Sequence, residues 1–241
     1  AGETVALVGE SGSGKSVSAL ASLGLLPDNA EQGGGVVWKG AEIDRGDAAA
    51  MRRLRGNEIG MIFQEPMTSL NPLHTIEKQI GESLRQHQGM SVEAARARTL
   101  DLLNRVGIPG AETRLASYPH ELSGGQRQRV MIAMALANNP DMLIADEPTT
   151  ALDVTIEAQI LDLLADLKRA EGLSMLFITH DLGVVRQIAD RVFVMRQGEL
   201  VESGDAASLF AAPREAYTRD LIAAQPQGIR PPEPTLSLIH I

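Results

Sequence analysis

A run of glycines that ends in a lysine and a serine lies near the start of the chain and has the composition of a phosphate-binding loop. Residues 9–16 read Gly-Glu-Ser-Gly-Ser-Gly-Lys-Ser, which matches the pattern G-x-x-x-x-G-K-[ST] at every fixed position. Glycines let the backbone curl until several N–H groups point at one anion, Lys15 can reach the β- and γ-phosphates of a nucleotide, and the Ser16 hydroxyl can ligate Mg²⁺. The sequence therefore predicts phosphate contacts from the following residues: Gly9, Glu10, Ser11, Gly12, Ser13, Gly14, Lys15 and Ser16.

The segments on either side of this loop have the structure that a phosphate-binding loop requires. Residues 4–8, before the loop, are apolar and β-branched and indicate a buried strand. Residues 17–26, after it, indicate a helix that ends near Pro27, and the amino end of that helix adds partial positive charge. The alternative, a plain glycine-rich turn, does not account for the agreement between the motif and both of its flanks.

Two adjacent carboxylates, Asp146 and Glu147, follow a second buried strand at 142–145. Ligands bind at the carboxyl ends of the strands in open parallel sheets, so both side chains are expected near the phosphate loop. We predict that Asp146 holds Mg²⁺ and that Glu147 orients and polarises a water for in-line attack on the γ-phosphate. The alternative is a pair of surface acids at a strand end, which is less consistent with a phosphate loop upstream.

A second glycine turn, Ser123-Gly124-Gly125-Gln126, opens an apolar helix and has the features of a second anion-binding helix terminus. One chain with two such termini either binds two ligands or completes a site on another copy of the domain. The residues alone leave both possibilities open.

The rest of the chain alternates between strand and helix patterns. Apolar segments predict further strands at 36–39, 58–63, 174–179, 191–195 and 199–203. Residues 143–145 and 175–178 are apolar throughout, which is typical of strands in a sheet that is covered on both faces. Gln197-Gly198, between the last two predicted strands, indicates a hairpin turn. Between Pro72 and Pro119 the pattern is helical, with helices predicted at 92–106 and, further on, at 154–168. We predict an α/β phosphate-loop core, mostly parallel sheet between helices, with a helical subdomain at about residues 65–135.

Composition narrows the function classes. The 241 residues suffice for a substantial core, and a net charge of −9 argues against a nucleic-acid-binding surface, which is usually basic. There is no cysteine, which excludes disulfides, thiolate metal sites and a cysteine nucleophile. No apolar run approaches the roughly 20 residues that span a bilayer. The chain is therefore expected to be soluble or attached to a membrane through a partner.

Taken together, the phosphate loop, the Ser123–Gln126 turn and the Asp146-Glu147 strand resemble those of ATP-binding-cassette (ABC) ATPases, in the same order, over about residues 1–225. The resemblance implies that Gln64, after the strand ending at Phe63, touches Mg²⁺ and the attacking water. It also implies that Asp153 lies in a loop crossing between two nucleotide domains, and that His180 is the switch histidine near the γ-phosphate.

The resemblance also implies a partner cassette. In relatives, two cassettes pack head to tail, and each ATP lies between the phosphate loop of one and the turn of the other, here Ser123, Gly124, Gly125 and Gln126. The cofactors implied are ATP and Mg²⁺. The partner cassette can be a separate chain or fused in the full-length protein.

A narrower resemblance concerns the transported cargo. Residues 63–72 and 118–126 resemble the peptide and nickel importers, and residues 71–109 resemble the first cassette of a fused ATPase from peptide or microcin C uptake. This implies a peripheral ATPase on the cytoplasmic face of the bacterial inner membrane, with integral-membrane permease subunits and, indirectly, a periplasmic or extracellular substrate-binding protein. The alternatives are a soluble ABC ATPase of DNA repair, chromosome organisation or translation, and a phosphate-loop kinase.

The ends of the chain suggest a fragment. Ala1 stands directly before the first strand, whereas relatives carry an antiparallel strand layer and an adenine-stacking aromatic upstream, so we expect an N-terminally truncated cassette. Residues 226–241 are expected to be a proline-rich linker and tail rather than part of the domain.

Overall fold

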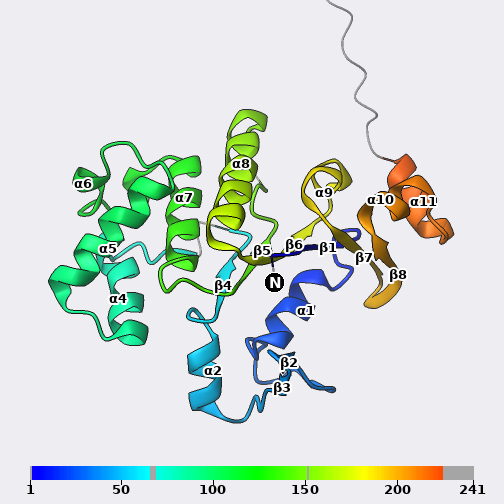
Figure 1. Ribbon diagram of the computed structural model, residues 1–241, viewed down its shortest axis with the longest axis horizontal. Helices are drawn as coiled ribbons and strands as arrows, with labels where there is room; N and C mark the ends of the chain where they lie inside the picture. Colours follow the sequence, from blue (N-terminus) through cyan, green and yellow to red (C-terminus); the bar gives the residue numbers. More distant parts are fainter. Residues whose placement is uncertain (1, 66–68, 151, 225–241) are drawn as a thin grey trace, which may run out of the picture.

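A six-stranded sheet forms the centre of the molecule (Figure 1). The computed structural model describes residues 2–65, 69–150 and 152–224. The strand order is β4-β5-β6-β1-β7-β8, with parallel pairing except between β7 and β8, which are antiparallel. The strands are β1 (Thr4–Val8), β4 (Ile59–Ile62), β5 (Met142–Asp146), β6 (Ser174–Thr179), β7 (Arg191–Arg196) and β8 (Glu199–Asp205).

The parallel register brings the candidate site residues to one edge of the sheet. Val8, the last residue of β1, lies opposite Thr179 of β6, and Asp146 of β5 lies opposite Ile178 of β6. The segments that follow these strands therefore emerge side by side, as expected for the ligand edge of an open parallel sheet. These segments contain the phosphate loop, the Asp146-Glu147 pair and His180.

Two helical layers cover the sheet because its central strands are apolar on both faces. On one face, Ile144 and Ile178 pack with α1 (Lys15–Ser22) and α2 (Ala48–Leu54). On the other face, Leu143 and Phe177 pack with the longer helices. These are α7 (Gly124–Ala135) and α8 (Val154–Glu171), with α9 (Leu182–Ile188), α10 (Ala206–Ala211) and α11 (Ala216–Ala223) nearer the β8 edge (Figure 1).

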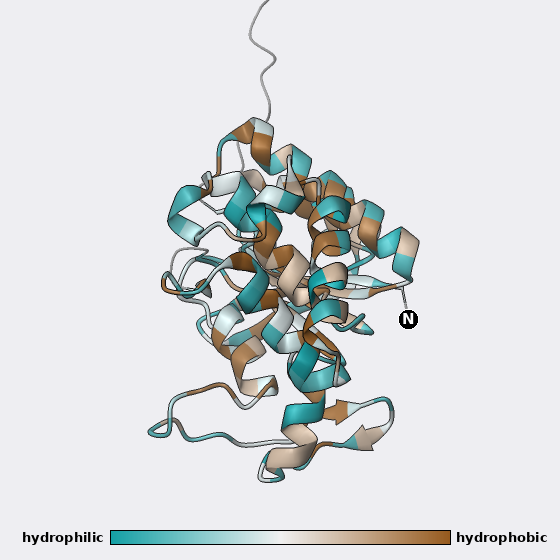
Figure 2. Cartoon of the chain, turned by 90° about the vertical axis from the view of Figure 1, so that its left-hand side faces the viewer, coloured by the Kyte–Doolittle hydropathy of each residue, from teal (hydrophilic) through white to brown (hydrophobic). Residues whose placement is uncertain are grey.

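The predicted helical subdomain corresponds to α4 (Ile76–Gln88), α5 (Val92–Arg105) and α6 (Ala111–Arg114), a 3₁₀ turn at Pro119–Glu121, and α7. The hydroxyls of Thr75 and Ser91 cap α4 and α5 by accepting backbone N–H groups three residues on. Figure 2 shows bands of hydrophilic and hydrophobic residues along the helices, as expected of helices with one buried face. A buried cluster including Ile80, Leu84 and Leu103 joins this segment to the core of α7 and α8.

Most predicted elements are present, with corrected bounds. The strands at 4–8 and 174–179 are found as predicted, and the hairpin is confirmed, with Gln197 at φ 50° and Gly198 at φ 85°. The first helix begins two residues earlier than expected and ends at Ser22, because Gly24 at φ 59° leaves the helical conformation. The predicted linker and tail at 226–241 lie outside the described residues.

Several short elements were not predicted, among them α6, α9, α10 and α11. The strand expected at 36–39 is only β2 (Val37–Trp38), and it pairs with β3 (Ala41–Glu42) in a separate two-stranded sheet. Helix α2 was also missed, although Asp47 caps it with its carboxylate.

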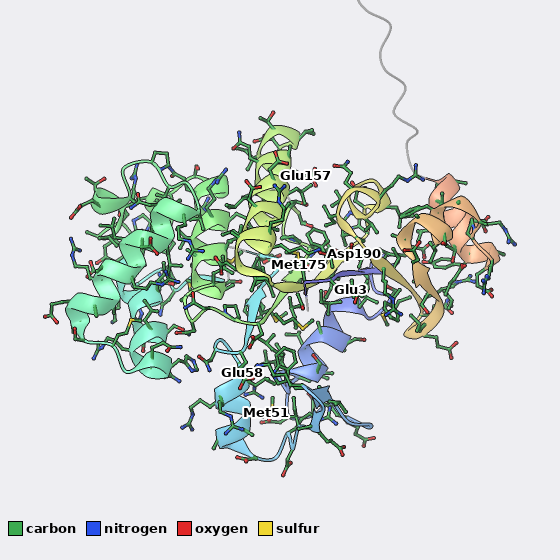
Figure 3. All side chains as sticks on the ribbon, viewed as in Figure 1. Glu3, Met51, Glu58, Glu157, Met175 and Asp190 are labelled. Carbon is green, nitrogen blue, oxygen red and sulfur yellow. The ribbon has the colours of Figure 1, made fainter. Side chains whose placement is uncertain are left out.

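The end of the sheet opposite the site is held by a carboxylate (Figure 3). Asp190 accepts a hydrogen bond of 2.7 Å from the backbone N–H of Thr4 and one of 3.0 Å from Lys168 Nζ. The Thr4 N–H and the Lys168 ammonium lower the pKa of Asp190 below its ordinary value. The ionised form therefore fixes the first residue of β1 to the loop before β7.

We predict that Asp190→Asn lowers the free energy of unfolding at neutral pH, and that its cost depends on pH. Because the folded-state pKa of Asp190 is depressed, its contribution is present above the unfolded pKa of about 3.9 and is lost as pH falls through the folded value. Urea unfolding of both proteins from pH 7 down to pH 3 should show the difference shrinking in acid. A difference that grows as the pH falls would contradict this.

Close backbone contact between β4 and α7 generates a second prediction. A Cβ added to Gly60 would overlap the carbonyl oxygen of Ala135, whereas a Cβ on Gly81 in α4 would meet Ala95 Cβ at an ordinary 3.8 Å. Gly60→Ala should therefore destabilise the fold by about 1–3 kcal/mol, and the matched Gly81→Ala should stabilise it by up to about 1 kcal/mol. Urea unfolding at pH 7 measures both, and equal effects of the two changes would contradict the packing described.

Candidate functional site

The loop between β1 and α1 has the conformation that its glycines allow. Gly12 and Gly14 have φ values of 79° and 97°, in the region that side chains disfavour. Gly9, at φ 155°, approaches the carbonyl oxygen of Met195 so closely that a Cβ would overlap it. Backbone geometry therefore favours glycine at the two fixed glycine positions of the motif, Gly9 and Gly14, and also at Gly12, a variable position within it.

Lys15 lies inside this loop and is only 4% exposed. Its Nζ donates hydrogen bonds of 2.9 Å to the carbonyl oxygens of Gly9 and Glu10 and lies 3.5 Å from Ser13 Oγ. Burial lowers the pKa of Lys15, while the nearby carboxylates of Glu147 and Asp146 oppose that shift. The acceptors are neutral oxygens, so the loop encloses a desolvated cation to which an anion would be attracted.

The phosphate loop and β5 meet at one hydrogen bond. Ser16 Oγ donates to Asp146 Oδ1 over 2.8 Å, across 130 positions of sequence. Asp146 is 4% exposed, and burial raises its pKa although the Ser16 hydroxyl counteracts the shift. A cavity of about 500 Å³ opens at this pair and is lined further by Phe63 and Gln64.

The donor set at this pair fits Mg²⁺. A hydroxyl and a carboxylate are hard oxygen ligands, and Mg²⁺ is usually held by one or two carboxylates together with substrate phosphates and water. Across 2–65, 69–150 and 152–224, no group of three or more His, Cys, Asp or Glu side chains could hold a metal alone. The arrangement therefore suits a metal that binds together with a phosphate ligand.

Glu147 lies at the centre of a cluster of side chains from separate segments. Gln64 Nε2 donates to its Oε2 over 3.0 Å, Thr150 Oγ1 donates to the same oxygen over 2.9 Å, and His180 Nδ1 lies 3.2 Å from Oε1. The Glu147 side chain is 12% exposed and its backbone is in the left-handed region, with φ 44°. The carboxylate is thus fixed from three sides while His180 remains 60% exposed.

Sequence reasoning named Gln64, Glu147 and His180 and missed the role of Thr150 in this cluster. No local sequence signal specified the contact, which depends on a turn after β5 in which the Thr150 N–H donates to the carbonyl oxygen of Glu147 over 3.1 Å. Such a turn places a side chain three residues on beside the carboxylate. Ala151, next to Thr150, lies outside the described residues.

The second glycine turn forms a separate group with Asp153. Ser123 Oγ accepts the Gln126 N–H over 3.3 Å and Gln126 Oε1 accepts the Ser123 N–H over 3.0 Å, which is a reciprocal cap on α7. A Cβ on Gly125 would lie 2.9 Å from Ile156 of α8, and Asp153 caps α8 through the Ile156 N–H. In Figure 1, α7 lies apart from α1, with β4 and β5 between them.

Comparison with known proteins identifies the family. Residues 1–150 match the family model described as ABC transporter. The chain is 62% identical over 232 residues to the peptidoglycan transport ATP-binding protein YejF of Agrobacterium fabrum, covering 95% of this chain and 42% of that protein. It is 56% identical over 233 residues to a putative peptide import ATP-binding protein of Brucella ovis, covering 94% of this chain and 69% of that protein.

A solved structure supports the same family assignment. A dimeric, post-hydrolysis state of the ATP-binding cassette MJ0796 bound to ADP and phosphate superposes with a TM-score of 0.74 at 33% identity, covering 85% of this chain and 86% of that one. The fold is that of an ATP-binding cassette, and the chain belongs to the ABC transporter family. It spans less than half the length of its Agrobacterium relative. In the described part of the chain, no helix has the length and hydrophobicity to cross a membrane.

We predict that Ser16→Ala removes most of the gain in ATP affinity that Mg²⁺ provides. Loss of even an indirect metal partner typically costs tenfold or more, so the affinity in Mg²⁺ should fall by at least about tenfold, toward the value in EDTA. Calorimetric titration with ATP in both conditions measures this. Ser22→Ala, on the same helix with its Oγ bonded to the carbonyl of Ala19, is the matched control. Unchanged Mg²⁺ dependence in Ser16→Ala would contradict the assignment.

Proposed function

We propose that this chain is a nucleotide-binding domain that hydrolyses ATP to power peptide import by a bacterial ABC transporter. The observation that carries the proposal is the Glu147 carboxylate, held by Gln64, Thr150 and His180 beside the buried Ser16–Asp146 pair. This arrangement supports a proton acceptor beside a pair of oxygen ligands for a metal, next to the phosphate loop. The proposal concerns an activity of the whole protein, and the chain spans less than half the length of its Agrobacterium relative.

The phosphate loop binds the β- and γ-phosphates of ATP. The loop amides between Glu10 and Ser16 point at the anion, and the amino end of α1 adds partial positive charge. Lys15 exchanges its carbonyl partners for phosphate oxygens, because a charged acceptor binds an ammonium more strongly than a neutral one.

The residues proposed to hold Mg²⁺ are Ser16 and Asp146, with Gln64 directly or through water. When bound, the metal neutralises charge on the β- and γ-phosphates. Because burial raises the pKa of Asp146, the carboxylate gains from a cation beside it.

Glu147 acts as the general base. Its carboxylate accepts a proton from the water that attacks the γ-phosphate in line with the leaving ADP. Gln64 and Thr150 hold one oxygen of the carboxylate by hydrogen bonds, which leaves the other oxygen, beside His180, for the water. His180, being exposed, can contact both the water and the γ-phosphate.

The site needs a second cassette. We propose that Ser123, Gly124, Gly125 and Gln126 of one copy cover the nucleotide held by the phosphate loop of the other, with Asp153 at the crossing between them. The separation of the two groups on one chain supports this arrangement (Figure 1). The γ-phosphate then holds the two domains together, and its hydrolysis releases them.

The importer assignment is supported by the names of the relatives, one a peptidoglycan transport and one a putative peptide import ATP-binding protein. We therefore favour it over a soluble ATPase of DNA repair or translation. On this assignment the protein lies peripherally on the cytoplasmic face of the inner membrane, bound to integral-membrane permease subunits. A substrate-binding protein is an indirect partner that delivers the peptide to the permease. The partner cassette is a second domain of the same kind, fused or separate.

We predict that Glu147→Gln lowers ATP hydrolysis by at least about 100-fold while ATP binding is kept, because the amide cannot accept the proton. The variant should accumulate as an ATP-bound dimer on size-exclusion chromatography with MgATP, and phosphate release measures turnover. Cells that carry the variant should also fail to take up a labelled peptide.

The matched control is Glu31→Gln, an exposed glutamate in the loop before β2. It should leave hydrolysis and uptake at wild-type levels. Hydrolysis by Glu147→Gln at near the wild-type rate would refute the role of Glu147 as the base. If the wild type hydrolyses ATP normally but cells with Glu147→Gln still take up the peptide, only the importer assignment is refuted.

A further inference from the structure

Two contacts reach the phosphate loop from the carboxyl-terminal part of the chain. The backbone N–H of Glu10 donates to the phenolic oxygen of Tyr217, on α11, over 3.3 Å and across 207 positions of sequence. The backbone N–H of Gly198, in the β7–β8 turn, donates to the carbonyl oxygen of Ser13 over 3.0 Å. These contacts fall on the second and fifth residues of the eight-residue loop Gly9–Ser16.

The Tyr217 ring is itself held in place. The guanidinium carbon of Arg196, at the end of β7, lies 4.9 Å from the centre of the ring, in cation–π contact. The ring also packs against the core cluster of β1, β7 and α9, together with Leu221 and Ile222 of α11. The ring that carries the phenolic oxygen is therefore held beside the loop by its packing and by Arg196.

Helix α11 is tied to β8 by a second carboxylate. Glu202 Oε1 accepts the N–H of Arg214 over 2.8 Å, and Glu202 Oε2 accepts the N–H of Glu215 over 3.1 Å. Glu215 is the residue that precedes the first turn of α11. The hairpin of β7 and β8 and helix α11 thus form one unit, here called the C-terminal brace (residues 191–224), which touches the loop at Glu10 and Ser13.

The segment from Glu10 to Ser16, whose first part lies between these two contacts, is the one proposed to supply amides to the phosphates. Ser13 N–H bonds back to the carbonyl of Glu10 over 3.2 Å, so the turn is closed at its base. An anion site made of backbone amides binds more tightly when its donors are already aligned, because less conformational entropy is lost on binding. Contacts from outside at Glu10 and Ser13 restrain the backbone of this segment and use only the Glu10 N–H, which leaves the amides that follow Ser13 for the anion.

We propose that Tyr217 is a positioning residue, which through its hydrogen bond to the Glu10 amide lets the C-terminal brace set the affinity of the phosphate loop for nucleotide. The inference rests on the proposed binding of ATP at that loop. Tyr217 does not touch the reacting atoms. It acts on binding, and the chemical step at Glu147 is left unchanged.

Tyr217→Phe isolates the hydroxyl, since the ring keeps its packing and its contact with Arg196. A hydrogen bond of about 1 kcal/mol corresponds to roughly a fivefold change, so we expect the KM for MgATP to rise about three- to tenfold while kcat at saturating ATP stays within twofold. Without nucleotide, hydrogen exchange at the Glu10 amide should accelerate by a similar factor, whereas amides of β1 and β6 should exchange as in the wild type.

Tyr118→Phe, the same substitution at a half-exposed tyrosine beside His120, is the control and should change neither KM nor Glu10 exchange. Equal KM and equal Glu10 exchange in wild type and Tyr217→Phe would overturn the inference. Faster exchange throughout the sheet would also overturn it, because the hydroxyl would then be merely structural. If the wild type binds no ATP, the proposed function fails, whereas unchanged exchange at Glu10 with normal ATP binding contradicts only the brace.

Discussion

The parallel pairing of β1 with β6 and of β6 with β5 is the constraint on which the site depends. Because Val8, Thr179 and Asp146 end their strands at one edge, segments far apart in sequence emerge within hydrogen-bonding reach. The Ser16–Asp146 and Glu147–His180 contacts both follow from this register. A slip of one strand by one residue would turn its side chains to the opposite face, the Asp146 carboxylate of β5 included, so the site depends on this register.

The charges at this edge are arranged for a ligand that carries negative charge and brings a cation with it. Lys15 is desolvated and bonded to neutral oxygens, and burial raises the pKa of Asp146. Each of these groups is more costly alone than in the presence of the opposite charge. A nucleoside triphosphate would supply the negative charge beside Lys15, and its magnesium ion the positive charge beside Asp146. Binding of metal and nucleotide at this edge is therefore expected to be cooperative.

Much of this arrangement could be predicted from sequence because its signals are local. The strands at 4–8 and 174–179 are uninterrupted apolar runs, and the glycine motif specifies a backbone conformation through positive φ angles. The elements that escaped prediction are short: β3 has two residues, α2 has seven with two adjacent arginines, and α6, α9, α10 and α11 have between four and eight. The contact of Tyr217 with Glu10 could not be predicted, because it joins residues 207 positions apart and depends on how α11 packs.

The same limit applies to Glu147: Gln64 and His180 were named as site residues, but their contacts with Glu147 and the contact from Thr150 could not be predicted. The left-handed backbone of Glu147 at φ 44° and the Thr150 hydrogen bond arise from the turn after β5, which no motif position specifies. These features hold the carboxylate in place, whereas the Ser123–Gln126 turn opens α7, which lies apart from α1 (Figure 1). This separation is the reason for proposing that the two groups act on one nucleotide from different copies.

The most direct test of this account is the structure of the Glu147→Gln variant with MgATP, read for the residues within hydrogen-bonding distance of the γ-phosphate. The account predicts Lys15 from one copy and Ser123 with the Gly125 amide from the other. A single copy that surrounds the γ-phosphate with its own residues alone would contradict it.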